Sequence, residues 1–428
     1  MNTYELIVYG CQMNDYDGER LAAVMEAAGY RQAEAEGEAD AVLVYTCAVR
    51  QSATDRALGR ITSLARRKKE SPAPVIGVGG CWPAVEAEFI REACPHVDFT
   101  FGTTKLEEVP ALVARARGEA AACEPAGDAA YVSPRRSAWP RANVSIMRGC
   151  DNFCAYCIVP YARGREEYRP MDDVLAEVDD LVRGGFRDIT LIGQNVNSYR
   201  RDGVSFAALL REVDGRCDGA FLRFTTNHPR DLGDETVAAM AEGRNVARHL
   251  HLPLQSGSDR VLRAMNRGYD REHYLGIVDA VREAVPGICL TTDILVGFPD
   301  ETEADFEETL ALVERVRYDS AYIFIYSPRP GTAAAKRPDA VPRPEKIRRL
   351  QTLGGRQREI SREINEGLVG EVVTALVEGR SKKDARELAG RTSESKTVNF
   401  GGRGETGEFV RVKITGASSW TLRGERIP

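Results

Sequence analysis

The sequence predicts an α/β protein with three successive parts: a parallel α/β domain, an open partial (βα)6 barrel and a small antiparallel β-barrel. Short β-rich runs alternate with helical stretches up to residue 117 and again from 143 to about 330, which predicts the first two parts. Beyond residue 366 only short β-rich runs separated by turn residues follow, which predicts the third. At 428 residues the chain can form such domains with sizeable cores.

The first expected domain, residues 1–117, contains four strand–helix pairs. The strands are expected at 6–9, 41–45, 75–79 and 98–101, and the helices near 15–28, 50–69, 85–93 and 105–117. A cysteine follows each of the first three strands within a few residues: Cys11, Cys47 and Cys81. Because the carboxyl ends of parallel strands share one edge, where ligands gather, these thiols are expected to converge on one metal–sulfur site.

The alternative for these three positions is small buried residues, since free cysteine is often buried. The remaining cysteines show no such placement and are expected to be incidental: Cys94, Cys123, Cys217 and Cys289.

A linker is expected at 118–140, where Ala, Pro, Gly and charged residues dominate, and it leads into a core at 141–365. Six core strands are expected, at 143–147, 188–192, 221–225, 249–254, 288–296 and 321–326. Six units are too few for a closed eight-stranded barrel, so an open barrel with a wide mouth is expected. A helix near 344–366 then precedes the last domain, 366–428.

The core opens with three cysteines in a C-x3-C-x2-C motif, Cys150, Cys154 and Cys157, directly after its first strand. Iron–sulfur clusters normally take four cysteine sulfurs, so three leave one iron able to chelate another molecule, as catalytic metals keep an open position. A zinc knuckle would need a fourth Cys or His nearby, and all five histidines lie far away in sequence. Buried structural cysteines are the other alternative.

The net charge of −6 gives no global support for binding nucleic acid, so any RNA contact must come from local basic patches. The candidate patches are Arg66 to Lys69; Arg135, Arg136 and Arg141; the arginines at 348, 349, 356, 358 and 362; and Lys382 with Lys383. The sequence has no export signal and no apolar stretch of membrane-spanning length, so a cytoplasmic protein is expected.

Over nearly its full length the chain resembles the radical S-adenosylmethionine (SAM) methylthiotransferases, and among them the MiaB type that acts on tRNA. The matching motifs are Tyr9 to Asn14, Thr46 to Arg50, Gly80-Cys81, Gly149 to Gly164, Leu191 to Tyr199, Leu252 to Arg260, Asp293 to Pro299 and Tyr326 to Thr332. Ser381 to Lys383 and Gly390 to Thr392 resemble the TRAM domain, a small RNA-binding barrel. The chain departs from the family pattern at Tyr45, where Asn is common, and at Trp82.

The resemblance implies a radical SAM barrel with two 4Fe-4S clusters. One would be bound by the catalytic residues Cys150, Cys154 and Cys157 and would hold SAM, and the other by Cys11, Cys47 and Cys81. Tyr156 matches an aromatic residue that flanks SAM in the family, and Gln194 and Gln255 are candidate SAM contacts because they follow core strands.

The implied reaction is methylthiolation at C2 of N6-(dimethylallyl)adenosine at position 37 of tRNA. The implied partners are a tRNA anticodon stem-loop and an electron donor such as flavodoxin or ferredoxin, and the protein is expected to be a monomer with no membrane partner. The nearest alternative is a sister methylthiotransferase acting on threonylcarbamoyl-adenosine in tRNA or on a ribosomal-protein aspartate. A more distant alternative is a noncatalytic iron–sulfur protein that binds RNA or senses redox state.

Overall fold

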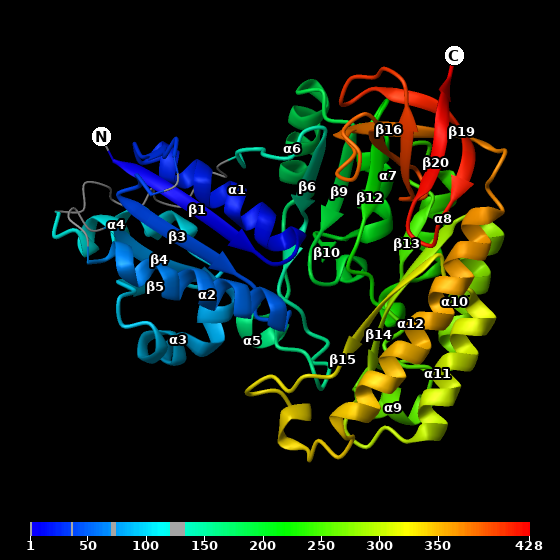
Figure 1. Ribbon diagram of the computed structural model, residues 1–428, viewed down its shortest axis with the longest axis horizontal. Coiled ribbons are helices and arrows are strands. Elements are labelled where there is room, and N and C mark those ends of the chain that lie inside the picture. The colour runs from blue at the N-terminus through cyan, green and yellow to red at the C-terminus, as the bar shows by residue number, and fades with distance from the viewer. Residues whose placement is uncertain (1, 36, 70–73, 120–132) are drawn as a thin grey trace. The chain divides into compact units, whose positions relative to one another are not determined.

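The computed structural model describes residues 2–35, 37–69, 74–119 and 133–428 (Figure 1). The chain splits into two compact units, one made of Met1–Ser137, Arg148–Asp151 and Cys157–Glu167, the other of Ala138–Met147, Asn152–Tyr156 and Tyr168–Pro428. The expected α/β architecture with a C-terminal β-barrel is confirmed. The domain boundaries 1–117, 118–140, 141–365 and 366–428 stay a prediction. Cys123 and most of the expected linker lie outside the described residues.

The first unit contains a five-stranded sheet in which all paired neighbours are parallel, in the order β2-β1-β3-β4-β5. Its strands are β1 (Thr3–Tyr9), β2 (Arg31–Gln32), β3 (Ala41–Thr46), β4 (Val75–Gly80) and β5 (Phe99–Thr100). Its helices are α1 (Gln12–Ala27), α2 (Gln51–Arg67), α3 (Cys81–Ala93), the short η1 (Leu106–Glu108), α4 (Val109–Ala116) and α5 (Val159–Arg163). The sequence reversal lies between β1 and β3, the position where open α/β sheets bind ligands.

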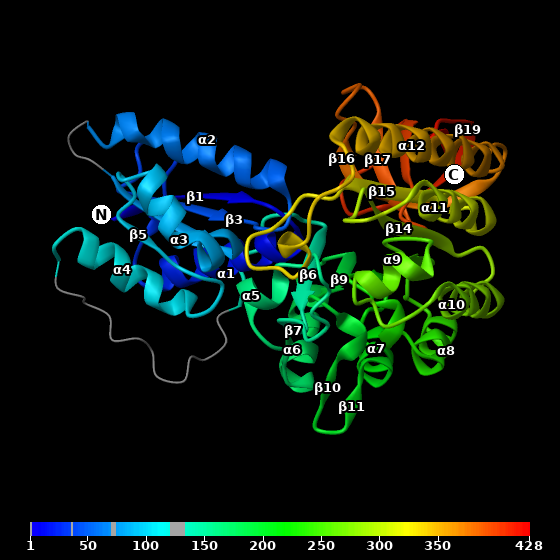
Figure 2. The same ribbon diagram turned by 90° about the horizontal axis from the view of Figure 1, so that it is seen from below.

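Both faces of this sheet are covered, which is why its central strands β3 and β4 read as continuous apolar runs. Helices α2, α3 and α5 pack on one face through residues such as Ile61, Ile90 and Ala162. Helices α1 and α4, with η1, pack on the other through residues such as Met25 and Val113. Figure 2 shows α2 and α4 on opposite sides of the strands.

The second unit contains six parallel core strands, as expected, but they form two three-stranded sheets, β12-β9-β6 and β13-β14-β15. The strands are β6 (Arg141–Ser145), β9 (Asp188–Ile192), β12 (Phe221–Phe224), β13 (His249–His251), β14 (Cys289–Val296) and β15 (Ser320–Ile325). Leu222 of β12 forms an isolated parallel bridge with Val246, three residues before the start of β13. Short ribbons β7 (Met147–Arg148) with β8 (Glu167–Tyr168), and β10 (Arg200–Arg201) with β11 (Val204–Ser205), complete the core.

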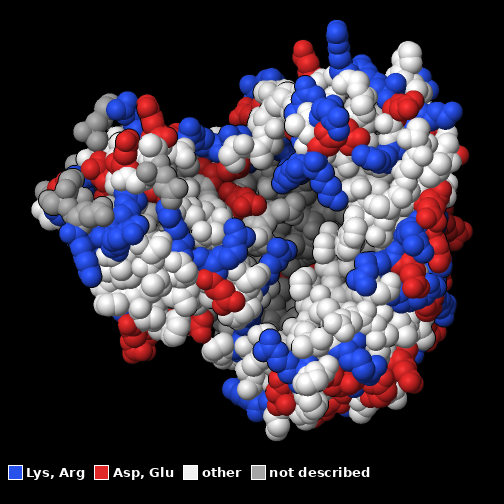
Figure 3. All heavy atoms as spheres, in the orientation of Figure 1, with Lys and Arg blue, Asp and Glu red and all other residues white. Residues whose placement is uncertain are grey.

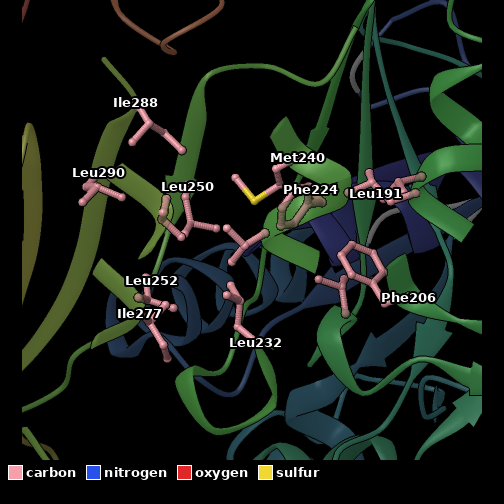
Figure 4. Packing of buried hydrophobic residues seen from close by; sticks show 14 of the residues in the cluster. Leu191, Phe206, Phe224, Leu232, Met240, Leu250, Leu252, Ile277, Ile288 and Leu290 are labelled. Atoms are coloured by element: carbon pink, nitrogen blue, oxygen red, sulfur yellow. The ribbon is translucent and has the colours of Figure 1, made fainter. Parts of the chain in front are cut away.

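Amphipathic helices cover the outer face of these strands and build the largest apolar core. They are α6 (Met171–Arg183), α7 (Phe206–Asp214), α8 (Asp234–Glu242), α9 (Asp259–Ala264), α10 (Arg271–Ala284), α11 (Glu303–Val316) and α12 (Arg343–Glu366), with short turns η2 (Val196–Ser198), η3 (Pro229–Asp231) and η4 (Ala334–Lys336). Figure 4 shows strand residues such as Leu250 and Leu290 packed with Met240 of α8 and Ile277 of α10. No helix among the described residues is both long and apolar enough to cross a bilayer.

The C-terminal strands close into a barrel in the order β16-β17-β18-β20-β19. The strands are β16 (Val372–Arg380), β17 (Leu388–Thr392), β18 (Thr397–Gly401), β19 (Phe409–Ala417) and β20 (Leu422–Ile427). Strand β17 has a weak sequence pattern, because it is five residues long and contains Gly390. The barrel is not wholly antiparallel, since β18 and β20 pair in parallel.

The barrel is docked on the amino ends of the core strands through Arg223 of β12, which is buried. Its Nε lies 3.0 Å from both carboxylate oxygens of Asp188. Its two Nη atoms donate to the carbonyl oxygens of Thr392 and Ser393 at 2.8 and 2.9 Å and to Oγ of Ser395 at 2.7 Å. The barrel therefore lies at the end of the core opposite to the carboxyl ends of the strands, where the candidate site residues follow.

Candidate metal and cofactor site

Cys11, Cys47 and Cys81 lie where β1, β3 and β4 end, as the alternation of strands and helices predicted. Cys11 caps the N-terminus of α1, and Cys81 is the first residue of α3. The side chain of Asn14 joins two of them, because its Oδ1 lies 3.8 Å from Sγ of Cys11 and 4.0 Å from Sγ of Cys81. Cys47 and Cys11 are hydrogen-bonded through their thiols. The fold thus brings together three cysteines that are far apart in sequence.

Glycines allow this convergence at two of the three strand ends. Gly10 has φ +147°, and a Cβ there would stand 2.8 Å from Cβ of Cys47. Gly80 has φ +101°, and a Cβ there would stand 2.4 Å from the carbonyl oxygen of Thr46. Any larger residue would be strained and would push neighbouring strand ends apart.

The three thiols differ in acidity. The hydrogen bond from Cys11 lowers the pKa of Cys47 to about 7, and the same pairing raises the pKa of Cys11. Burial raises the pKa of Cys81 to about 11, although the neighbouring guanidinium of Arg163 opposes that rise. Two thiols thus keep their protons at neutral pH unless a cation binds them, and metal binding would release those protons.

The second cysteine set is divided between the two units, with Cys150 and Cys157 in the first and Cys154 in the second. The backbone N–H of Cys150 donates to the carbonyl oxygen of Gly164 at 3.2 Å, and Cys157 lies two residues before the start of α5. Cys150 and Cys154 are buried, and Cys157 is partly exposed.

A buried arginine, Arg267, contacts the sulfur of Cys154 at 3.3 Å. The same Nη1 lies 3.4 Å from the hydroxyl of Tyr156, the residue expected beside SAM, and Nε donates to the Tyr269 hydroxyl at 3.1 Å. Sequence reasoning missed Arg267, because nothing in its local sequence marks it. Its guanidinium would offset the negative charge of a ligating thiolate.

Buried polar atoms without a hydrogen-bond partner gather where core strands end. They include Oδ1 of Asn195 after β9, Oδ1 of Asn227 and Nε2 of His228 after β12, and the hydroxyl of Tyr326 after β15. Burial lowers the pKa of His228 to about 2, so its ring is neutral, and Nδ1 accepts from the Arg230 N–H, which leaves the proton on Nε2. Orphan donors and acceptors of this kind fit a polar ligand such as SAM.

The expected SAM contacts Gln194 and Gln255 also follow core strands, β9 and β13 respectively. Gln194 is partly buried and follows β9 by two residues. Gln255 has φ +68°, and its N–H donates to the Asp293 carbonyl oxygen at 2.8 Å. Their role with SAM stays a prediction.

Within the described residues, no group of three or more His, Cys, Asp or Glu side chains is arranged to hold a metal ion as it stands. All nine cysteines of that part of the chain are free thiols. Cluster binding by the two sets of three therefore stays a prediction. The donor chemistry fits it, because thiolates bind iron–sulfur clusters and each set leaves one position open.

Three family models match the chain. The Radical SAM superfamily matches residues 144–313, the Uncharacterized protein family UPF0004 matches 3–102, and the TRAM domain matches 367–427.

Two relatives bear the name tRNA-2-methylthio-N(6)-dimethylallyladenosine synthase. The protein of Carboxydothermus hydrogenoformans is 45% identical over 99% of this chain and 98% of its own length. That of Moorella thermoacetica is also 45% identical, over the same shares. The chain belongs to this synthase family. It is therefore a radical SAM enzyme with a C-terminal TRAM domain, and the predicted family is confirmed.

The fold is similar to that of a solved structure, the radical S-adenosylmethionine methyltransferase TsrM from Kitasatospora setae. The TM-score is 0.62 at 17% identity, covering 78% of this chain and 77% of that one. That structure holds cobalamin and a [4Fe-4S] cluster. The likeness shows the fold alone.

Tyr45 and Trp82, the two positions at which the sequence is expected to depart from the family pattern, are both buried. Trp82, the second residue of α3, packs in the core that α2 and α3 form with the sheet, and its Nε1 donates to Glu86 at 2.7 Å. Tyr45 reaches the network described below. The three other described cysteines, Cys94, Cys217 and Cys289, are buried, and the incidental role expected for them stays a prediction.

Proposed function

We propose that this synthase-family enzyme replaces the C2 hydrogen of N6-(dimethylallyl)adenosine at position 37 of tRNA with a methylthio group, using SAM and two 4Fe-4S clusters. The observation that carries the proposal is the 45% identity to the named synthases over essentially both full lengths. The convergence of Cys11, Cys47 and Cys81 on one sheet edge supports the second cluster.

In this proposal Cys150, Cys154 and Cys157 hold the cluster that binds SAM, and Cys11, Cys47 and Cys81 hold the cluster that supplies sulfur. When bound, a reduced cluster with SAM supplies the 5′-deoxyadenosyl radical that an unreactive aromatic C–H bond requires. The chain's own residues would bind and orient the cluster and SAM. Arg267 contacts the sulfur of Cys154, and the unpaired atoms of Asn195, Asn227 and His228 would bind the polar groups of SAM.

The candidate basic patches offer less unpaired positive charge for RNA than the sequence suggested. Most arginines of the candidate patches are neutralised by ion pairs: Arg67 with Glu5, Arg135 with Glu26, Arg136 with Glu19, Arg141 with Glu378, Arg348 with Glu303 and Arg356 with Glu314. Figure 3 shows basic and acidic side chains intermixed along the edge formed by α10, α11 and α12.

The barrel retains exposed basic residues. Lys382 and Lys383 lie in the loop between β16 and β17, and Arg411 and Lys413 lie on the exposed side of β19. Trp420, in the turn between β19 and β20, is 66% exposed and offers a stacking surface for a base. These residues suit contacts to phosphates and unpaired bases of an anticodon stem-loop.

The remaining components follow from the same proposal. A low-potential donor such as flavodoxin or ferredoxin reduces the clusters, the enzyme acts as a monomer, and the reaction takes place in the cytoplasm.

The decisive test is anaerobic turnover of tRNA carrying N6-(dimethylallyl)adenosine, with reconstituted protein, SAM and dithionite, followed by nucleoside mass spectrometry. The expected product carries one methylthio group in place of one hydrogen. If that substrate is unchanged while threonylcarbamoyl-adenosine in tRNA, or the ribosomal-protein aspartate, is modified, the chain is a sister enzyme. If SAM is never cleaved, the proposed radical SAM activity is wrong.

The cluster assignment is tested by iron and sulfide content in matched cysteine variants. Cys81→Ala should lose one four-iron cluster, and Cys154→Ala should lose the other. Cys94→Ala is the matched control, because Cys94 is also a buried cysteine of the first unit but lies at the end of α3. Two clusters retained in Cys81→Ala would refute the N-terminal site.

A further inference from the structure

One buried arginine of the first unit, Arg163, lies against the strand-end cysteines. It ends α5, six residues after Cys157, and its side chain is only 5% exposed. Its Nε donates to Sγ of Cys81 at 3.1 Å, and its Nη2 donates to Oδ1 of Asn14 at 3.1 Å. That Asn14 oxygen is the atom placed between Cys11 and Cys81.

The charge of Arg163 is balanced by one buried carboxylate, Asp17 of α1. Nη2 of Arg163 lies 2.8 Å from Oδ2 of Asp17, whose side chain is 4% exposed. The same oxygen accepts a hydrogen bond from the Tyr45 hydroxyl at 3.0 Å. Tyr45 is fully buried in β3, two residues before Cys47.

This ion pair is poorly explained as a stabilising device. Burying two charges costs several kcal/mol per ion, and apolar replacements of buried pairs are often neutral or stabilising, so such pairs are weak contributors to stability. Here the guanidinium points its second donor at a cysteine sulfur, and the carboxylate takes a further donor from the buried hydroxyl of Tyr45.

We propose that Tyr45, Asp17 and Arg163 form a relay of hydrogen bonds that sets the reduction potential of the cluster bound by Cys11, Cys47 and Cys81. The inference rests on the proposed function, which supplies that cluster. Arg163 is the positioning residue that touches the sulfur, Asp17 limits its positive charge, and Tyr45 in turn limits the negative charge of Asp17.

The direction of each effect follows from charge. Reduction adds an electron to the cluster, so a positive charge or an N–H donor at a ligating sulfur stabilises the reduced form and raises the potential. An uncompensated carboxylate nearby does the opposite. Arg163 therefore raises the potential, Asp17 lowers it, and the Tyr45 hydroxyl weakens the effect of Asp17.

The experiment uses the full chain with Cys150, Cys154 and Cys157 replaced by alanine, so that only the N-terminal cluster can form. Iron and sulfide content are measured first, and the midpoint potential is then determined by redox titration followed by electron paramagnetic resonance. The variants are Arg163→Met, Asp17→Asn and Tyr45→Phe in this background.

Two matched controls carry the same substitutions at partly or fully buried positions of the first unit. Arg67→Met removes an arginine that pairs with Glu5, and Tyr4→Phe removes a buried hydroxyl that donates to Glu26 at 3.2 Å. They report what the loss of an ion pair or a hydroxyl does without contact with the cysteines.

Arg163→Met is expected to lower the potential, with at least a tenfold change in the reduction equilibrium constant, which is 59 mV for one electron. Asp17→Asn is expected to raise it, and Tyr45→Phe to lower it by less. Both controls should leave it unchanged. Opposite shifts for Asp17→Asn and Tyr45→Phe support the relay even if Arg163→Met binds no cluster.

Shifts that equal those of the controls, or that share one sign in all three variants, overturn the relay while leaving the cluster assignment intact. A parent protein without iron and sulfide overturns the cluster assignment itself, and the relay with it. The two failures are therefore distinguishable.

Discussion

Replacement of Arg223 by methionine tests whether one buried side chain docks the barrel on the core. The substitution removes five hydrogen bonds: two to Asp188, and three to the turn formed by Thr392, Ser393 and Ser395. Asp188 is 2% exposed, so its carboxylate would stay buried without its main partner.

The expected cost follows from that burial. Removing one member of a buried ion pair costs about 3–5 kcal/mol, because the remaining charge is left uncompensated. The ring contact between Phe221 and Phe409 and the 2.6 Å ion pair of Lys396 with Asp319 still hold the barrel, so unfolding of the whole chain is not expected. We expect the free energy of unfolding to fall by about 4 kcal/mol.

The assay is urea denaturation followed by tryptophan fluorescence in a Trp82→Phe background, which leaves Trp139 and Trp420 in the second unit. Trp139 reports on the barrel, because its ring lies beside Gly407. Arg216→Met is the control, since Arg216 and Asp179 form a surface pair with side chains 38% and 40% exposed. That control should change stability by less than about 1 kcal/mol.

A double variant separates charge from packing. Adding Asp188→Leu to Arg223→Met should recover most of the lost stability, because no charge then remains buried. Acidification should also recover part of the stability that Arg223→Met loses. Burial already raises the pKa of Asp188 against the opposing effect of Arg223, and without Arg223 the carboxyl group takes up a proton more readily. A loss below about 1 kcal/mol, or one equal to that of Arg216→Met, would refute the docking role.

Three further predictions concern other parts of the molecule. Gly80→Ala should lower the free energy of unfolding by about 1–3 kcal/mol, because alanine is strained at positive φ, and it should also reduce the iron bound at the N-terminal site. Gly59→Ala is the control: open space surrounds Gly59, so the substitution should be neutral or stabilising. Urea denaturation measures both. Burial lowers the pKa of His249 to about 3, so its folded form binds fewer protons than its unfolded form. Stability should therefore fall below pH 6.5 by about 1.4 kcal/mol per pH unit for this group, and His249→Asn should flatten that slope in denaturation at pH 7, 6 and 5. Replacing both Lys382 and Lys383 with alanine should weaken tRNA binding and reduce the slope of log affinity against log salt by up to about 2, and an unchanged slope would exclude phosphate contacts by these lysines.

The alternation of strands and helices was sufficient to predict the order of elements. Strands β1, β3 and β4 were expected close to where they lie, because apolar runs of buried parallel strands are local patterns. Sequence patterns did not predict that the core strands form two separate sheets, nor did they predict β17. Pairing between strands depends on residues far apart in the chain, and a short strand containing glycine has little pattern of its own.

In the candidate site, too, some residues could be predicted from the sequence and others could not. The six cysteines could be selected from spacing and from their place after strands, and the motifs around them identified the family. The side chains that surround the cysteine sulfurs could not be predicted from spacing or motifs. Arg163 approaches Cys81 from a segment 82 residues away, and Arg267 approaches Cys154 from 113 residues away.

The basic patches show the limit of composition as a guide. Arg348 and Arg356 read as a basic helix face, but acidic residues of the neighbouring helix α11 pair with both of them. The sequence by itself determined the elements, the possible ligands and the family, because these depend on neighbours along the chain. The tertiary structure alone decided which charges stay free, which sulfurs receive a guanidinium and which end of the core the barrel covers, because those contacts form only when distant segments pack together.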